Sequence, residues 1–401
     1  MDYFTFLGTG GINGYSEINY AYNGNDFTTQ FVQLSILKFY ANDIDRMVVF
    51  CTDISFNKYA EQLKKAVASA DNCVAVEFVK ISADISSVDF ISEILGLTRS
   101  DEIIIDVTHI FRDIPMKMLF MIKYIEQSKN IRISHLFYGK ITPNEHKGIL
   151  LDLIDDYHTQ ELSQALYLFD KTLYLSPDVL ESYAVKDQRV EELLETMSQL
   201  NKYLETCNYE STLRSCHKIL KKCQTIAKKP DDYYVLVPFI ERIIQKFSPI
   251  ENGSNFMTGI ILIRILLENG KLQTAITFAD NLFRVSLIDK SVDNPQRVFR
   301  SKNSGNDIYY YSQELMYGAR GYECMNGDGR TNNKVTGIIL NQKLSVYLKQ
   351  NSKIGTFYSN IRNKVNHAGK VDKAEAEEAT LGLLEVIEKM ETLVKGVAGE
   401  K

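Results

Sequence analysis

Hydrophobic and polar positions follow one pattern up to about residue 162 and another after it. In the first part, short β-rich apolar runs alternate with stretches of helical periodicity. The predicted strands are Tyr3–Leu7, Arg46–Cys51, Val74–Val79, Glu102–Val107, Ile131–Tyr138 and Gly148–Ile154. The predicted helices between them are Thr29–Tyr40, Lys58–Ser69, Val88–Leu95 and Pro115–Gln127. Strands separated by helices indicate βαβ units, so we expect a Rossmann-like, doubly wound parallel sheet, with a long Gly/Asn/Tyr-rich loop after the first strand.

In the second part the β signal largely disappears and helical periodicity takes over. The predicted helices are Val190–Leu204, Glu210–Ala227, Tyr234–Phe247, Met257–Asn269, Leu272–Leu287, Val335–Gln350 and Lys373–Val397. Residues Asp293–Arg330 are rich in Asn, Gly and Arg, and we expect an exposed irregular segment there. The fold class is therefore α/β followed by all-α. We predict an α/β ligand-sensing domain over 1–157, connecting helices over 158–204 and a helical domain over 205–401.

Composition is that of an ordinary globular protein. The 401 residues suffice for two cores, and 45% are hydrophobic and 24% charged. A formal net charge of −5 excludes a uniformly basic coat for nucleic acid, although a local basic cleft remains compatible with it. The six cysteines are scattered without a framework spacing, which favours reduced thiols. No apolar stretch reaches the roughly 18 to 20 residues of a membrane span, so we expect a cytoplasmic protein with no membrane partner.

Two segments carry candidate binding chemistry in the α/β part. Gly8-Thr9-Gly10 follows the first predicted strand, and Thr108-His109-Ile110-Phe111-Arg112 follows the strongest one, EIIIDV. Ligands of open parallel sheets bind outside the carboxyl ends of the strands, where strand order reverses. In a 3-2-1-4-5 order the first and fourth strands are neighbours, so both segments would face one crevice. The second segment opens a helix, whose amino terminus favours an anion.

A dinucleotide-binding fingerprint is disfavoured in the first segment. Asn13 stands where that fingerprint has its third glycine, and Asp53 follows Gly8 by 45 residues instead of roughly 20. By spacing alone, the glycines are equally compatible with a tight turn between strand and helix, with His109 as a neighbour of a helix cap.

Three segments together resemble a known family. Phe6–Gly10 (FLGTG), Asp106–Met116 (DVTHIFRDIPM) and Phe137-Tyr138-Gly139 are similar to the CARF domain of CRISPR-associated CARF–HEPN proteins, the ancillary ribonucleases of type III CRISPR systems. The resemblance spans roughly Met1 to Ile154. Known members bind a cyclic oligoadenylate across the two-fold axis of a CARF dimer. The resemblance thus implies a homodimer, or a higher oligomer, with cyclic tetra- or hexa-adenylate as activator.

The resemblance also assigns roles to individual residues. Contacts to the phosphates and riboses of the activator would come from Gly8, Thr9, Gly10, Thr108, His109 and Arg112. Tyr15 and Tyr138 would stack on adenine. Ile110 stands where many relatives have glycine, which leaves the number of adenylates in the ring open.

For the helical part the resemblance implies a HEPN domain, whose signature is Arg, four to six residues, then His. Arg362 and His367 match it, with Asn363 following the arginine. About 0.6 such pairs are expected by chance, so the structural context has to support the motif, and a surface histidine near a helix end is the alternative. The implied chemistry is metal-independent cleavage of single-stranded RNA, with no cofactor, giving 2′,3′-cyclic phosphate and 5′-hydroxyl ends. A histidine can act as acid or base at neutral pH, an arginine grips phosphate, and Asn363 would orient the histidine or the phosphate.

Positions five apart on a straight helix point about 140° from each other. One Arg362/His367 pair therefore does not obviously converge on one phosphate. Two copies facing each other across a dimer axis could do so, which is how relatives build their site.

Other candidate features are weaker. A zinc site at Cys207, Cys216, His217 and Cys223 lacks the close ligand pairs that zinc sites use. Two basic groups could contact RNA: Arg214, Lys218, Lys221, Lys222, Lys228, Lys229, and then Arg297, Arg300, Arg320, Arg330. A run like the first group is more often a solvated helix face, whereas flexible arginines like those of the second suit single-stranded RNA.

The leading hypothesis is an endoribonuclease that cyclic oligoadenylate activates allosterically. One alternative is a non-catalytic cyclic-nucleotide sensor whose helical domain binds a partner or nucleic acid. Another is a nucleotide-dependent enzyme acting in the α/β crevice. In a variant compatible with the first hypothesis, Thr9 or Thr108 would assist slow cleavage of the activator itself.

Overall fold

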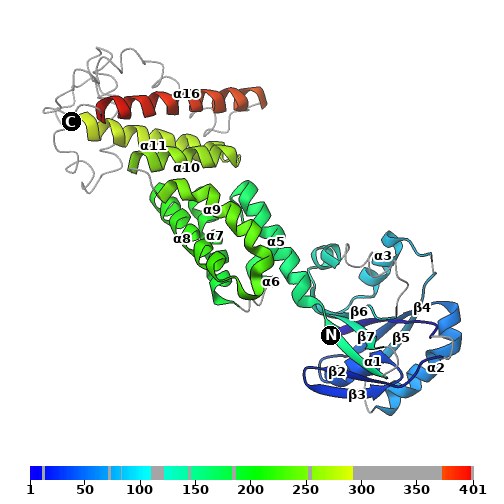
Figure 1. Cartoon of the computed structure of the whole chain (residues 1–401). Helices are drawn as coiled ribbons and strands as arrows, with labels where there is room; N and C mark the ends of the chain where they lie inside the picture. Colours follow the sequence, from blue (N-terminus) through cyan, green and yellow to red (C-terminus); the bar gives the residue numbers. More distant parts are fainter. Residues whose placement is uncertain are drawn as a thin grey trace. The chain divides into compact units, whose positions relative to one another are not determined.

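The computed structural model describes residues 1–10, 14–70, 74–82, 84–109, 122–142, 146–182, 187–251, 255–291 and 373–398. The chain forms two compact units, Met1–Glu161 and Leu162–Lys401 (Figure 1). Several predicted features lie outside the described residues, and these are Ile110, Arg112, Asp293–Arg330, Val335–Gln350, Arg362, Asn363 and His367.

Unit 1 is built on an eight-stranded sheet of order β3-β2-β8-β7-β6-β1-β4-β5. Its strands are β1 (Asp2–Leu7), β2 (Ile18–Tyr22), β3 (Asn25–Thr29), β4 (Arg46–Cys51), β5 (Ala75–Lys80), β6 (Glu102–Asp106), β7 (Arg132–Thr142) and β8 (Lys147–Asp152). The strands β5, β4, β1, β6 and β7 run parallel to one another, in the predicted 3-2-1-4-5 order. Every residue of β1 and β4 is buried, as expected for strands covered on both faces.

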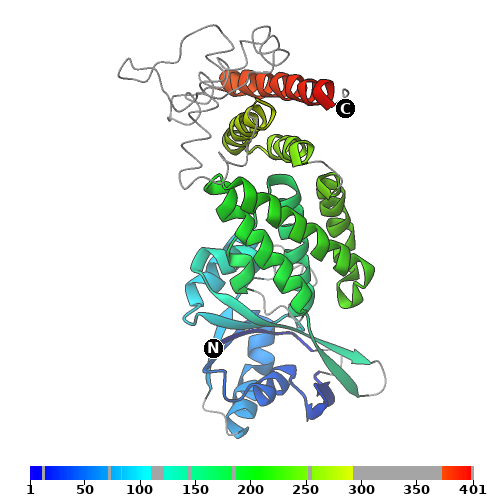
Figure 2. The ribbon, with the colours of Figure 1, turned by 90° about the vertical axis from the view of Figure 1, so that its left-hand side faces the viewer.

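The other edge of the sheet differs from the sequence prediction. The predicted long loop contains an antiparallel hairpin, β2–β3, and β2 pairs in parallel with β8. Asn23 and Gly24 turn the hairpin with φ values of 48° and 77°. An Asn-Gly pair between two strand-like runs is a strong hairpin signal. The sequence analysis missed it because the two strands have five residues each and β3 is largely polar. In Figure 2 the antiparallel pair β7–β8 is the teal hairpin.

Helices cover both faces of the parallel part of the sheet. α1 (Val32–Phe39) and α2 (Asp53–Ser69) pack in one hydrophobic cluster, while α3 (Ser87–Leu97) and the helical residues 122–129 pack in the other. α2 begins five residues earlier than predicted because Thr52 and Ser55 form a reciprocal capping box. The amino terminus of α2 therefore follows the end of β4 directly.

The predicted last strand, Gly148–Ile154, was placed too far along the chain. β8 ends at Asp152, whose carboxylate accepts a hydrogen bond of 3.2 Å from the backbone N–H of Ile154. Ile154 is thus the first residue of the helix α5 (Ile154–Thr172). An acidic side chain just before a helix satisfies one of its unpaired amides, which explains the early end of the strand.

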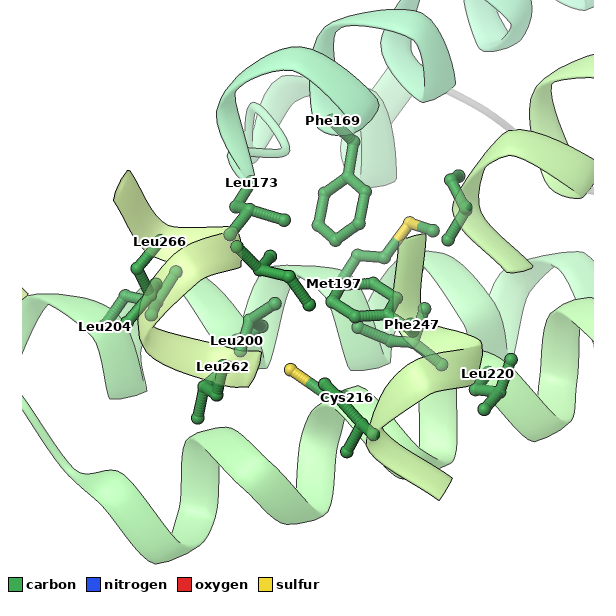
Figure 3. Packing of buried hydrophobic residues seen from close by; sticks show 14 of the residues in the cluster. Phe169, Leu173, Met197, Leu200, Leu204, Cys216, Leu220, Phe247, Leu262 and Leu266 are labelled. Carbon is green, nitrogen blue, oxygen red and sulfur yellow. The ribbon is translucent and has the colours of Figure 1, made fainter. Parts of the chain in front are cut away.

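Unit 2 is helical over its described residues. Its elements after α5 are α6 (Asp178–Ser182), α7 (Gln188–Glu205), α8 (Tyr209–Lys228), the 3₁₀ helix η1 (Asp231–Leu236), α9 (Val237–Glu251), α10 (Asn255–Glu268), α11 (Leu272–Ser291) and α16 (Lys373–Ala398). One cluster of buried side chains joins them, with Phe169, Met197 and Phe247 at its centre (Figure 3). No helix among the described residues combines the length and apolarity needed to cross a bilayer.

Candidate ligand-binding site

A cavity of about 510 Å³ lies at the carboxyl ends of β1, β4 and β6. This volume is within the range typical of small-molecule sites. The described residues that line it come from the loop after β1, from the junction of β4 with α2 and from the segment after β6; among them are Gly8, Thr9, Gly10, Gly14, Tyr15, Cys51, Thr52, Ser55, Thr108 and His109. The structure therefore brings Gly8-Thr9-Gly10 together with Thr108 and His109, the described part of the second predicted segment, at one cavity.

The loop after β1 needs glycine at two of its described positions. Gly10 and Gly14 have φ values of 71° and 82°, a backbone conformation that other residues rarely adopt. A Cβ atom on either would lie 2.9 Å from the hydroxyl oxygen of Tyr59, which is closer than real Cβ contacts. The loop backbone thus packs directly against Tyr59, at the wall of the cavity.

Tyr15 supports this wall. Its hydroxyl donates a hydrogen bond of 3.1 Å to the carbonyl oxygen of Gly8. Its ring contacts those of Phe31, Tyr59 and His109, with centroids 5.2, 4.8 and 5.0 Å away. Burial raises the pKa of Tyr15 well above its ordinary value, so the hydroxyl stays protonated as a donor. In this arrangement Tyr15 positions Gly8 and His109.

Asp106 is the anchor of the segment after β6, and the sequence analysis did not assign it a role. Its carboxylate is fully buried and accepts hydrogen bonds from the Thr5 hydroxyl at 2.7 Å and the Thr108 backbone N–H at 2.9 Å. The Thr108 hydroxyl also donates to it. A carboxylate that bonds its own chain two residues on is an Asx-type turn, and the Asp-x-Thr order after a buried strand is the signal that could have identified it.

Thr108 connects the two strands beside the cavity. While its hydroxyl donates to Asp106, the same oxygen accepts a hydrogen bond of 2.7 Å from the backbone N–H of Gly139 on β7. Its only hydroxyl proton is already used, so in this arrangement Thr108 can offer a ligand an acceptor lone pair but no donor.

His109 has an unused polar atom. Its Nε2 is buried and makes no hydrogen bond with the described part of the chain. Burial lowers the pKa of His109, and the nearby Asp106 carboxylate offsets part of that effect. A buried unpaired polar atom costs about 1–3 kcal/mol, which a hydrogen-bonding ligand in the cavity would recover. The lowered pKa favours the neutral imidazole, and the described residues leave its Nε2 without a hydrogen-bond partner.

The amino terminus of α2 forms a third wall that the sequence analysis missed. Thr52 and Ser55, the two capping residues, both line the cavity. A helix amino terminus carries a partial positive charge, which favours anionic groups. Lys58, one turn further along, donates a hydrogen bond of 3.2 Å to the carbonyl oxygen of Thr9 and so ties α2 to the loop after β1. The Thr-x-x-Ser pattern after RMVVFC could have indicated this helix start.

Tyr138 does not line the cavity. It lies on β7 with 42% of its surface exposed and pairs with Leu151 of β8. Its neighbours Phe137 and Gly139 are buried, because side chains alternate between the faces of a strand. Among the residues of β7, Ile141 lines the cavity instead. The structure thus separates Tyr138 from the other described residues predicted to bind the ligand.

The cysteines considered for zinc also lie elsewhere. Cys216 and Cys223 are buried in the core of unit 2, and burial raises the pKa of both thiols to about 12. The described residues contain no group of three or more His, Cys, Asp or Glu side chains that could hold a metal ion.

Comparison with known proteins gives one informative match. No model of a known protein family matches the chain. Over 233 residues, 57% of this chain, the sequence is 23% identical to the CRISPR-associated protein MJ1674 of Methanocaldococcus jannaschii. The chain resembles a CRISPR-associated protein. The match covers 36% of the length of that relative, and it supports a relation to CRISPR-associated proteins.

The cavity combines features that suit an anionic ligand with ring systems. None of its described lining residues is acidic, so this part of the wall carries no carboxylate that would repel a phosphate. The glycine-rich loop places backbone beside the cavity, and the start of α2 adds its partial positive charge, although the amides of Thr52 and Ser55 are already bonded within the capping box. The imidazole of His109 contributes a hydrogen-bonding nitrogen. Apolar residues such as Ile18 and Ile81 supply surface for a base.

Proposed function

We propose that this protein is a CRISPR-associated endoribonuclease that cleaves single-stranded RNA without a metal ion, and that cyclic oligoadenylate bound to unit 1 activates it. In this proposal unit 1 is the CARF-like sensor and unit 2 contains the HEPN-like nuclease. The active form is a homodimer, in which two copies of the activator site meet.

The observation that carries the proposal is the cavity at the ends of β1 and β6. It is lined by His109, whose buried Nε2 has no partner among the described residues, by the glycine loop after β1 and by the amino terminus of α2. Each of these can bind a phosphate or ribose without a charged side chain. The likeness to a CRISPR-associated protein supports the same function.

The proposed reaction uses Arg362 and His367 of two copies. The RNA 2′-hydroxyl loses its proton as it attacks the phosphorus, and the 5′-oxygen leaves with a proton. Histidine can transfer these protons near neutral pH, and arginine can balance the charge that develops on the phosphate oxygens. Asn363 orients the histidine or the phosphate. Because no step requires a metal, cleavage continues in EDTA.

Control by the activator requires a difference in affinity between two states. Cyclic oligoadenylate must bind the active arrangement of the dimer more tightly than the inactive one, and the nuclease activity rises by the resulting shift in population. Residues that contact the activator therefore set the concentration needed for activation, while Arg362 and His367 set the rate at saturation.

The test mixes purified protein with labelled single-stranded RNA in EDTA, with and without cyclic tetra- or hexa-adenylate. We expect activator-dependent cleavage that His367→Ala reduces by at least about 10²–10⁴-fold. Arg112→Ala should raise the activator concentration needed and leave saturated cleavage largely unchanged. His146→Asn is the control, because His146 is exposed and asparagine tolerates its φ of 49°.

The outcomes separate the alternatives. Activator binding without cleavage under any condition would favour the non-catalytic sensor. Cleavage that persists in His367→Ala would exclude the proposed nuclease site. Unchanged activator affinity in Arg112→Ala would show that Arg112 does not belong to the activator site.

A further inference from the structure

The exposed face of α8 carries a row of basic side chains. Within α8 the exposed positions are Glu210, Arg214, Lys218, Lys221, Thr225 and Lys228. These positions follow each other at intervals of three or four, so they form one stripe along the helix. We infer that this α8 stripe, from Arg214 to Lys228, binds the phosphate backbone of single-stranded RNA.

The opposite, apolar face of α8 determines which side of the helix faces solvent. Cys216, Ile219, Leu220, Cys223 and Ile226 are almost fully buried in the core of unit 2. Figure 3 shows Cys216 and Leu220 directed into the cluster around Met197 and Phe247. Because this core holds the apolar face of α8, the helix presents the stripe to solvent before any ligand binds.

The charge of the stripe is not neutralised by the described neighbours. The amines of Lys218, Lys221 and Lys228 form no ion pair with the described residues. Lys222, at the flank of the stripe, does pair with Glu192 of α7. Glu210 is the single acidic residue of α8, and the whole chain carries a net charge of −5. Because the protein as a whole is acidic, a local basic surface favours binding of an anionic partner at that surface over non-specific binding elsewhere.

The length of the stripe matches a short nucleic-acid strand. Arg214 and Lys228 are separated by about 21 Å, at 1.5 Å per residue. One strand with stacked bases carries a phosphate about every 3.4 Å, so roughly six phosphates lie alongside the stripe. Lysines are flexible point charges that suit such a backbone without reading its sequence. The choice of RNA rests on the proposed function, in which unit 2 must hold an RNA strand.

The test measures RNA binding by the full-length His367→Ala protein, which does not cut its ligand, without activator. The probe is a 12-nucleotide labelled RNA of mixed sequence, titrated from 50 to 300 mM salt. Lys218→Glu/Lys221→Glu reverses two stripe charges. Lys64→Glu/Lys65→Glu makes the same charge change at exposed positions of α2 in unit 1 and is the matched control. Circular dichroism and thermal unfolding check that both variants fold.

Each phosphate contact contributes about 0.7 to the slope of log affinity against log salt. Loss of two phosphate contacts lowers the slope by about 1.4 and weakens binding about 25-fold at 0.1 M salt, so we expect the Lys218→Glu/Lys221→Glu variant to lose at least about this much affinity. The α2 control should stay within about two-fold, the size of a general charge effect. Lys218→Gln/Lys221→Gln should lose affinity without the repulsion that glutamate adds.

Equal effects of the α8 and α2 variants, or none, would overturn the inference. So would polyglutamate or phosphatidylserine vesicles that bind the stripe more tightly than RNA does. These results remain separate from the proposed function. RNA binding that depends on the stripe but never leads to cleavage would contradict the nuclease and keep the inference. Activated cleavage with an unchanged KM for RNA in Lys218→Glu/Lys221→Glu would keep the proposed nuclease and contradict RNA binding by the stripe.

Discussion

The cavity of unit 1 and the α8 stripe of unit 2 both suit phosphate groups, but they use opposite means. The cavity offers no charged side chain among its described lining residues and depends on backbone amides, the start of α2 and the imidazole of His109. The α8 stripe offers exposed amines on flexible stems. Fixed dipoles in a partly buried site select one ligand geometry, whereas mobile charges bind any polyanion in a salt-dependent way.

The cavity and the α8 stripe also differ in the interactions that stabilise them. Around the cavity, one buried carboxylate, Asp106, fixes Thr5 and Thr108 by hydrogen bonds. Under the α8 stripe, apolar packing does most of this work, with the Lys222–Glu192 ion pair and the Asn208 cap beside it. The cavity is thus sensitive to the loss of single polar atoms, and the stripe is not. Three predictions test this contrast, from the largest expected effect to the smallest.

The largest effect is expected for Asp106→Ala. The change leaves the hydroxyls of Thr5 and Thr108 and the N–H of Thr108 without their acceptor, and each such group costs about 1–3 kcal/mol when buried. We expect a loss of about 3–5 kcal/mol in the free energy of opening measured by hydrogen exchange at amides of β1 and β6. Asp84→Ala, at an exposed position, should change it by less than about 0.5 kcal/mol. A similar loss in both variants would show that the hydrogen bonds of Asp106 do not stabilise the segment after β6.

An intermediate effect is expected for Gly10→Ala. Alanine at a φ of 71° costs about 1–2 kcal/mol, and its Cβ would also meet the Tyr59 hydroxyl at 2.9 Å. Gly24→Ala is the matched control, because Gly24 has a φ of 77° and nothing within 4 Å of an added Cβ. Unfolding in urea should show a loss of about 2–4 kcal/mol for the first variant and about 1–2 kcal/mol for the second.

Adding Tyr59→Phe to Gly10→Ala tests the contact itself. Without the hydroxyl, most of the difference between Gly10→Ala and Gly24→Ala should disappear. If the double variant is as unstable as Gly10→Ala alone, the close approach of the loop to Tyr59 is not what requires glycine there.

The smallest effect concerns pH. Because burial lowers the pKa of His109, the unfolded chain binds more protons below the ordinary pKa of about 6.5, and the contribution of this group to stability is lost as pH falls through that range. An anion in the cavity would favour the protonated form. Cyclic oligoadenylate should therefore bind more tightly as pH falls from 8 to 6, by at most about tenfold per pH unit.

Calorimetry in two buffers of different ionisation enthalpy would measure the proton uptake that accompanies this binding. His109→Gln should abolish the uptake, whereas His146→Asn should retain it. Uptake that survives in His109→Gln would assign the proton to another group and would leave the cavity without its titratable contact.

The sequence was informative where the pattern is local and strong. Buried apolar runs such as RMVVFC and EIIID gave the parallel strands, and their separation by helices gave the order that places β1 beside β6. It was less informative where pairing is non-local. The hairpin β2–β3 gains its stability from pairing with β8, more than 100 residues away, which no local window contains.

The candidate site shows the same division. Gly8, Gly10, Thr108 and His109 could be named from the sequence, because strand ends with glycine or polar residues are where ligands bind in such sheets. Thr52 and Ser55 were not named, since their place at the cavity depends on where α2 begins. Tyr138 was named, but it lies on the outward side of β7.

The sequence by itself determined the two classes of unit, the parallel order of the central strands and the segments that follow them, because these depend on periodicity within short windows. Only the tertiary structure decided which side chains face the cavity, what Asp106 holds, and that Arg214, Lys218, Lys221 and Lys228 share one exposed face of α8. The physical reason is that exposure and hydrogen-bond pairing are set by what packs against an element, and that partner is usually distant in the chain.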